Sequence, residues 1–73
     1  MNNTAAPTTF EKLPFEAWDK PAFRSTLDPR FEIVERGWAW EIYKMASDGV
    51  TLDHIHLSHN LAEAERVIAR EIR

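Results

Sequence analysis

The chain has 73 residues, with 12 acidic and 9 basic side chains and a net charge of −3 at pH 7, which corresponds to one small acidic domain. A domain of this size buries a modest fraction of its surface and is only marginally stable by itself. Cysteine is absent, so disulfide bonds, thiolate zinc sites and thiol nucleophiles are excluded.

The first residues of the chain differ in character from the rest. Residues 1–9 are small and polar and include a proline, which favours a disordered tail. Residues 10–73 are then expected to form a single α+β domain. The N-terminus lacks the basic and apolar regions of a signal peptide, and no apolar run approaches the ~20 residues that a membrane span needs.

An aromatic segment follows the tail, and two prolines divide it. Pro14 can open a turn, and Pro21 fits the first turn of a short helix that ends near Leu27. The sequence Asp28-Pro29 then predicts a break before the next element. Two interpretations of the aromatic side chains remain open: they close the core or cover part of the sheet, or some of them bind a partner.

The central region is predicted to be a three-stranded antiparallel meander, with strands near 31–36, 38–46 and 50–57. Asp48-Gly49 is among the strongest two-residue hairpin signals, and Arg36-Gly37 is a weaker one. With these turns, Ile33 faces Trp40, Tyr43 faces His54, and Glu41 faces His56.

The two predicted turns agree on which residues share a face of the sheet. The first face collects large apolar residues, namely Phe31, Ile33, Trp38, Trp40, Ile42, Ile55 and Leu57. The second face is mixed, with Glu32, Val34, Ala39, Glu41, Tyr43, Met45, Leu52, His54 and His56. A one-residue slip would scatter both sets, which supports the register. Trp40 is expected in the core, and Trp38 beside its turn is expected to be partly exposed.

The last element is predicted to be a helix near 60–72. Asn60 is a favourable N-cap, and Glu63 resembles the second residue of a capping box. Apolar residues recur after it at helical spacing. The predicted fold class is therefore α+β: a short N-terminal helix or turns, a three-stranded antiparallel meander, and a C-terminal helix packed on the first face.

The histidines of the third strand are the one cluster that suggests ligand chemistry. His54 and His56 are two residues apart on a strand and would share a face. With Glu41 across from them they could hold zinc. The alternatives are ordinary cross-strand polar pairs or a histidine patch at a protein interface. We expect no bound metal and no cofactor.

Catalytic and nucleic-acid signatures are absent from the sequence. The chain has two glycines, and it contains neither a Gly-rich phosphate loop nor a nucleophile elbow, so we expect a protein that is not an enzyme. The excess negative charge lies within residues 31–59, which hold five acidic and two basic side chains. Such a sheet should repel a phosphate backbone.

Two resemblances bear on function. The predicted element order, a short helix, three strands and a helix, is similar to the double-stranded-RNA-binding domain, but the stretch Asn60 to Glu65 replaces that family's lysine-rich helix start. The segment 31–73 resembles short phage and bacterial strand–strand–strand–helix proteins with a Trp-containing second strand, here Trp38-Ala39-Trp40. Size, acidity and lack of cysteine are similar to anti-CRISPR proteins, a resemblance that implies an inhibitor carried by a phage or mobile element.

The sequence thus suggests a small non-enzymatic binding protein that occupies a basic surface of a larger protein or nucleoprotein complex. Direct nucleic-acid or membrane binding is not expected, and the compartment would be the cytoplasm, that of a bacterial host if the gene belongs to a phage. Alternatives are a metal-binding protein with the histidine pair, or a degenerate RNA-binding-like domain used for protein contacts or homodimerisation. The predicted partner-binding residues are Glu41, Tyr43, Met45, Asp53, His54 and His56.

Overall fold

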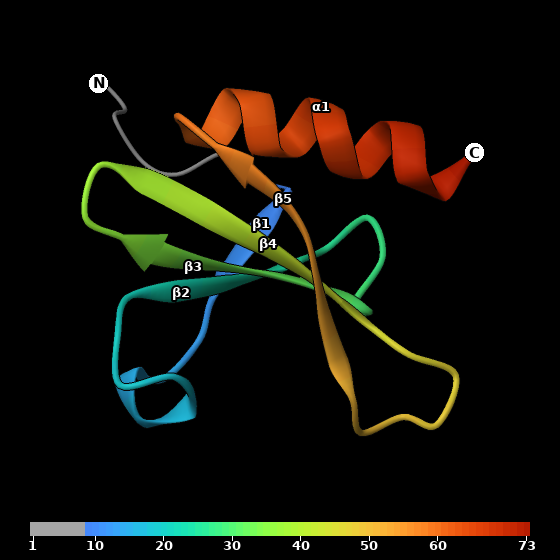
Figure 1. Cartoon of the computed structure of the whole chain (residues 1–73), viewed down its shortest axis with the longest axis horizontal. Helices are drawn as coiled ribbons and strands as arrows, with labels where there is room; N and C mark the ends of the chain where they lie inside the picture. The colour runs from blue at the N-terminus through green and yellow to red at the C-terminus, as the bar shows by residue number, and fades with distance from the viewer. Residues whose placement is uncertain (1–8) are drawn as a thin grey trace.

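The computed structural model describes residues 9–73 as a five-stranded antiparallel sheet with one helix (Figure 1). The strands lie side by side in chain order. The elements are β1 (Phe10–Lys12), the 3₁₀ turn η1 (Phe15–Ala17), β2 (Ala22–Ser25), β3 (Phe31–Arg36), β4 (Ala39–Met45), β5 (Leu52–Ser58) and α1 (Leu61–Ile72). The α+β class is confirmed. The three predicted strands are present as β3, β4 and β5, but the prediction of only three strands is wrong, because β1 and β2 extend the sheet.

The predicted disordered tail lies outside the described residues, except for its last member, Thr9. The Thr9 hydroxyl donates to a Glu65 carboxylate oxygen at 2.5 Å. The Thr9 carbonyl accepts a hydrogen bond from the Thr26 amide at 2.8 Å. Residue 9 is therefore tied both to α1 and to the end of β2.

The segment after Pro21 is a strand, so the helix predicted there is wrong. Phe23 lies opposite Ile33, and Ala22 lies opposite Val34, in an antiparallel pair with β3. The Pro21 carbonyl accepts the Glu35 amide at 2.9 Å, which extends this pairing by one bond. Phe23 thereby joins the apolar residues that pack on the core. Pairing with a distant strand has overridden the local helix signal of Pro21.

The earlier proline behaves as predicted, since Pro14 precedes η1 and opens a turn. The Ala17 amide donates to the Pro14 carbonyl at 3.0 Å. Phe15 on this turn is 59% exposed. Trp18, just after the turn, is partly buried against the sheet.

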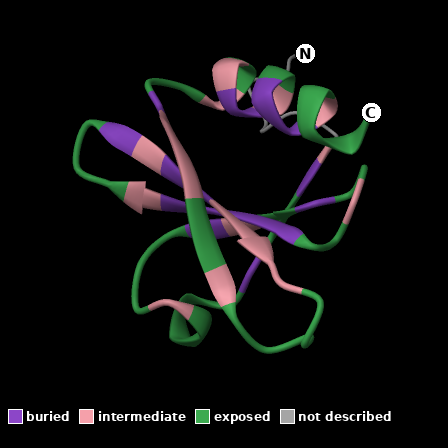
Figure 2. Ribbon diagram, turned by 45° about the vertical axis from the view of Figure 1, so that its right-hand side comes forward, coloured by how far each residue is buried: buried purple, intermediate pink, exposed green. Residues whose placement is uncertain are grey.

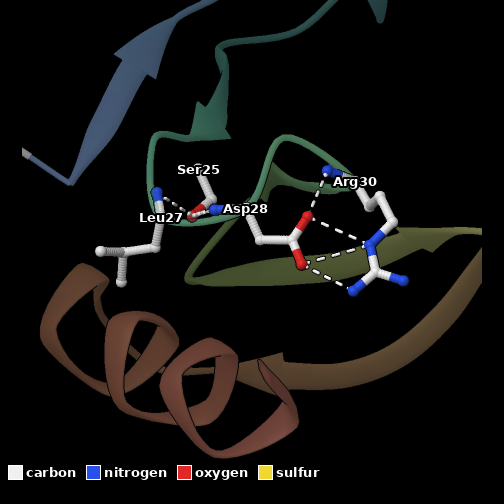
Figure 3. A network of polar contacts seen from close by, with 4 residues as sticks. All are labelled: Ser25, Leu27, Asp28 and Arg30. Carbon is white, nitrogen blue, oxygen red and sulfur yellow. Dashed lines mark hydrogen bonds and ion pairs between the residues drawn. The ribbon is translucent and has the colours of Figure 1, made fainter. Parts of the chain in front are cut away.

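The loop between β2 and β3 is held by its own side chains, as Figure 3 shows. The buried Ser25 hydroxyl accepts the amides of Leu27 and Asp28 at 3.1 and 3.3 Å. The Asp28 carboxylate accepts the Arg30 amide at 3.1 Å and forms an ion pair with its guanidinium at 2.7 Å. The predicted break at Asp28-Pro29 is confirmed, because β2 ends at Ser25 and β3 begins at Phe31.

The first predicted hairpin has the right faces and the wrong register. Arg36 pairs with Ala39, and Ile33 pairs with Ile42 rather than with Trp40. The two-residue loop is thus Gly37-Trp38, not Arg36-Gly37. Gly37 has a φ of 56°, and a glycine first in a two-residue hairpin loop is the pattern of a type II′ turn. The error is two residues, and a shift of two leaves every side chain on its predicted face.

The second hairpin follows the predicted register near its turn and departs from it further along. Met45 pairs with Leu52 and Tyr43 with His54, as predicted, but Ile42 then pairs with His56. The β5 strand carries one extra residue at this point, Ile55, which is a β-bulge. Beyond the bulge each residue of β5 has changed face relative to the prediction. Glu41 therefore lies opposite Leu57, and the predicted Glu41–His56 pair is wrong.

The main core lies between the first face of the sheet and α1, and buried stretches concentrate there in Figure 2. Phe31, Ile33 and Ile42 are fully buried. Trp40 is partly buried and packs against this cluster, whereas Trp38 is 72% exposed. At the helix start the Asn60 side chain accepts the Glu63 amide at 2.8 Å, which confirms the predicted N-cap.

Candidate functional site

The second face of the sheet carries two buried carboxylates at its centre. Glu32 on β3 is 6% exposed and Glu41 on β4 is 8% exposed. They lie on the same face because Glu32 pairs with Tyr43 and Glu41 pairs with Val34 across the β3–β4 ladder. Buried carboxylates are costly unless they are paired, so their partners define what this face can do.

Glu32 is held from the N-terminal segment. The indole Nε1 of Trp18 donates to one carboxylate oxygen at 2.8 Å. The guanidinium of Arg24 on β2 donates to the other oxygen through Nε at 3.3 Å and Nη2 at 3.1 Å. Neither residue is close to Glu32 in sequence, so this contact fixes the segment after η1 onto the sheet.

Glu41 is held from its own hairpins. Arg36 donates Nη1 to Oε2 at 2.7 Å, and the Tyr43 hydroxyl donates to Oε1 at 3.1 Å. The Nε2 of His54 lies 3.7 Å from Oε2. Burial alone would raise the pKa of Glu41, but the hydrogen bonds from Arg36 and Tyr43 outweigh it and lower the pKa below its usual value. Glu41 is therefore an ionised carboxylate with its oxygens already occupied.

Tyr43 is the meeting point of these groups. Its ring centroid lies 4.8 Å from that of Trp18 and 5.3 Å from that of His54, the latter in an edge-on arrangement. Burial and the hydrogen bond to Glu41 raise the pKa of its hydroxyl. Trp18 and Tyr43 also pack on the second core cluster, which is made of Leu13, Ala22 and Val34. The N-terminal segment thus covers part of the second face, the first of the two interpretations left open by the sequence.

The exposed part of this face is a strip along the β4–β5 hairpin, formed by Tyr43, Met45, Leu52 and His54 (the hairpin strip). Tyr43 pairs with His54, and Met45 pairs with Leu52. The Met45 and Leu52 side chains are partly exposed and belong to neither core cluster. The hairpin extends away from α1, and η1 lies on the side of the sheet opposite the helix (Figure 1).

Asp53 and His56, two of the predicted partner-binding residues, lie apart from this strip. Asp53 is opposite Lys44, whose ammonium lies over the Phe31 ring on the first face of the sheet. His56 follows the bulge and points to the helix side, where its Nε2 is 3.7 Å from a Glu63 oxygen. Four of the six predicted residues are thus brought together: Glu41, Tyr43, Met45 and His54.

The predicted alternative of a metal site fails on this geometry. It required His54 and His56 on one face with Glu41, and the bulge separates the two histidines. Within residues 9–73 no group of three or more histidine, cysteine or acidic side chains has the arrangement of a metal site.

Three residues of this face were missed by sequence reasoning, namely Trp18, Arg24 and Arg36. Trp18 and Arg24 reach Glu32 only through the pairing of β2 with β3, which the sequence did not reveal. Arg36 was assigned to a turn, although it ends β3. The available signal was Glu32 itself, an acidic residue between Phe31 and Ile33 on the first predicted strand, because a carboxylate that becomes buried there requires a partner.

Comparison with protein-family models, curated proteins and solved structures finds no significant match. Among the described residues no helix has the length and apolar character needed to cross a membrane.

Proposed function

We propose that the chain is a small non-enzymatic binding protein that docks on a larger protein or nucleoprotein complex through the hairpin strip. The observation that carries the proposal is that Tyr43, Met45, Leu52 and His54 form two adjacent cross-strand pairs that remain at least partly exposed, with Met45 and Leu52 outside both core clusters. Aromatic residues and methionine are enriched at the centre of protein interfaces. In the hairpin strip the apolar pair Met45 and Leu52 adjoins the pair Tyr43 and His54, which carries the polar groups.

Two contacts hold the Tyr43 side chain of the hairpin strip in place. Glu41 fixes the Tyr43 hydroxyl, and Trp18 packs on the Tyr43 ring at a centroid distance of 4.8 Å. A side chain that is already held loses little freedom when a partner binds, which favours affinity. Glu41 is therefore a positioning residue in this proposal rather than a contact residue.

The partner is proposed to have a basic surface, because the excess negative charge of the chain lies within residues 31–59. In its narrowest form the proposal is an inhibitor of a host defence complex, of the anti-CRISPR type, acting in the cytoplasm of a bacterial host. Size, acidity and a small antiparallel α+β architecture support that form.

Affinity capture with paired variants tests the proposal. The tagged chain is incubated with bacterial lysates, and proteins retained by the wild type are compared with those retained by Met45→Glu/Leu52→Lys. This double variant preserves net charge and should abolish retention with an unchanged thermal melt. The control, Phe15→Ala, removes an exposed apolar group on η1 and should retain the same proteins.

Two results would overturn parts of the proposal. Equal retention by the double variant and the wild type would remove the hairpin strip from the interface. For the narrower form, the purified chain is added to DNA cleavage assays of CRISPR effector complexes, and an absence of inhibition across the effector types would reject the anti-CRISPR assignment.

A further inference from the structure

A second surface, on the other side of the molecule, is hollow and basic. A hollow of about 410 Å³ lies between β5 and the outer side of α1. Arg66, Arg70 and Arg73 line it from the helix, and His56 lines it from the strand. Val67 and Ala69 supply apolar wall. The hollow uses none of the residues of the hairpin strip.

Two contacts of α1 show which side of the helix faces which edge of the sheet. Glu65 on one side accepts the hydrogen bond from Thr9, the residue before β1. Glu63 on another side lies 3.7 Å from His56 of β5. Since β1 and β5 are the two edges of the sheet, the side of α1 that carries Glu63, Arg66 and Arg70 is the one beside the β5 edge.

The arginines of the hollow have no carboxylate partner in the described part of the chain. The ion pairs there use Arg24, Arg30 and Arg36 instead. The one carboxylate in the hollow, Glu63, accepts the His59 amide at 3.0 Å and faces the His59 ring at 3.2 Å. The negative end of the helix dipole favours Arg70 and Arg73. It does not account for Arg66, which stands four residues from Arg70, a spacing at which like charges repel.

The strand beside the hollow has an unpaired edge. Among residues 9–73, β5 pairs only with β4. An edge strand directs alternate backbone N–H and C=O groups outward, where an extended chain can add as a further strand. A chain paired in this way runs along β5 and directs half of its side chains toward α1.

We propose that this edge binds an extended acidic segment of another protein. The segment adds as a strand to β5, and its carboxylates form charge-assisted hydrogen bonds with Arg66, Arg70 and Arg73. Arginine suits this task because its planar guanidinium can hold a carboxylate with two parallel bonds. This surface is independent of the hairpin strip, so either can be correct without the other.

Charge and backbone pairing favour an acidic peptide over two other occupants, a second copy of the chain and a nucleic acid. Antiparallel pairing of β5 edges from two copies would bring the arginines of both helices toward each other, which is unfavourable. Nucleic acid cannot pair with the backbone groups of the strand edge as a peptide strand does. An acidic peptide uses both the arginines and the edge.

The test uses fluorescein-labelled ten-residue peptides and fluorescence anisotropy at low salt. The probe alternates glutamate with valine; one control replaces glutamate with lysine, and a second replaces the valines with proline, which cannot donate strand hydrogen bonds. Proteins are the wild type, Arg66→Gln/Arg70→Gln, and the charge-matched control Lys12→Gln/Lys20→Gln. We expect the acidic probe to bind the wild type and the lysine control variant equally, and the arginine variant at least about tenfold more weakly.

The contrary outcomes are distinct. No binding of the acidic probe at about 1 mM, or equal binding by the arginine variant, overturns the site. Equal binding of the proline peptide overturns strand addition, which amide chemical shifts along Leu52–Ser58 would report independently. Tighter binding of labelled single-stranded DNA or RNA than of the acidic probe replaces the peptide by a nucleic acid. Self-association of the wild type at the concentrations used replaces it by a second copy.

Discussion

The six arginines of the chain fall into two groups, one in the sheet and its loops and one on the helix. Arg24, Arg30 and Arg36 each hold a carboxylate, at 3.1, 2.7 and 2.7 Å. The helix arginines Arg66, Arg70 and Arg73 have no ion pair within the described residues. The same side chain therefore serves two purposes in one small domain. Arg24 and Arg36 neutralise the buried Glu32 and Glu41, Arg30 holds Asp28 in its loop, and on the helix the positive charge remains available.

The largest effect on stability is expected at the second face of the sheet, where Arg24 and Trp18 both contact Glu32. Trp18→Ala removes the indole that packs on Tyr43 and donates to Glu32. We expect the free energy of unfolding to fall by about 2–3 kcal/mol, less than the ~3–5 kcal/mol typical of buried aromatic truncations, because Trp18 is only partly buried. Chemical denaturation measures it.

Trp38→Ala is the matched control, since Trp38 is 72% exposed and lies in a turn. Its effect should remain within about 0.5 kcal/mol. Equal losses in the two variants would show that the N-terminal segment does not cover the second face.

An intermediate effect is expected when a paired carboxylate loses its charge. Glu41→Gln keeps the shape and removes the ion pair with Arg36, whose side chain is 66% exposed. The expected loss is about 1 kcal/mol, reduced from the value for a fully buried pair by solvent around the arginine.

Glu41→Gln is compared with a variant of the helix, Arg66→Gln/Arg70→Gln/Arg73→Gln. We expect the helix variant to change the free energy of unfolding by less than about 0.5 kcal/mol. Relief of repulsion between Arg66 and Arg70 offsets the lost interaction with the helix dipole. If the helix variant is the more destabilised of the two, those arginines are structural, and the peptide site loses its rationale.

The smallest effect is a dependence on acid at the β4–β5 turn. Hydrogen bonds from Thr51 and Val50 lower the pKa of Asp48 from 3.8 to about 2. A carboxyl whose pKa is lower in the folded state stabilises the fold above its unfolded pKa and loses that contribution as pH falls. The melting temperature should therefore fall between pH 3.8 and about 2.

Asp48→Asn isolates this contribution, because the amide oxygen can still accept the two backbone bonds but cannot titrate. Its melting temperature should fall less steeply over the same pH interval. Identical pH profiles for the variant and the wild type would mean that the turn makes no acid-dependent contribution.

The central strands and the helix could be predicted because two kinds of local signal agreed there. Alternation of apolar residues placed Phe31, Ile33 and Ile42 on one face. That assignment remained correct although the turn was misplaced by two residues, because a shift of two keeps each side chain on its face. At the helix, Asn60 and the spacing of apolar residues set the start and the buried side. Such signals lie within one element and its turns, where sequence spacing translates directly into direction.

The missed features depend on partners far away in sequence. The helix spacing of Phe23 and Leu27 is a weak signal, and pairing of β2 with β3 determines the strand. The bulge at Ile55 leaves no mark in an alternating sequence, yet it separates the two histidines and places His56 beside the helix. Most of the hairpin strip was therefore predicted, whereas the partners of its buried carboxylates and the basic hollow were not.

The bulge also bears on how the protein behaves when it is concentrated. A flat, regular edge strand is a template for open-ended aggregation into cross-β fibrils, which grow by in-register stacking of straight strands. The extra residue at Ile55 bends β5 and increases its local twist, so two copies cannot stack along its whole length. The chain can therefore keep an unpaired edge open to a short peptide segment while resisting fibril growth.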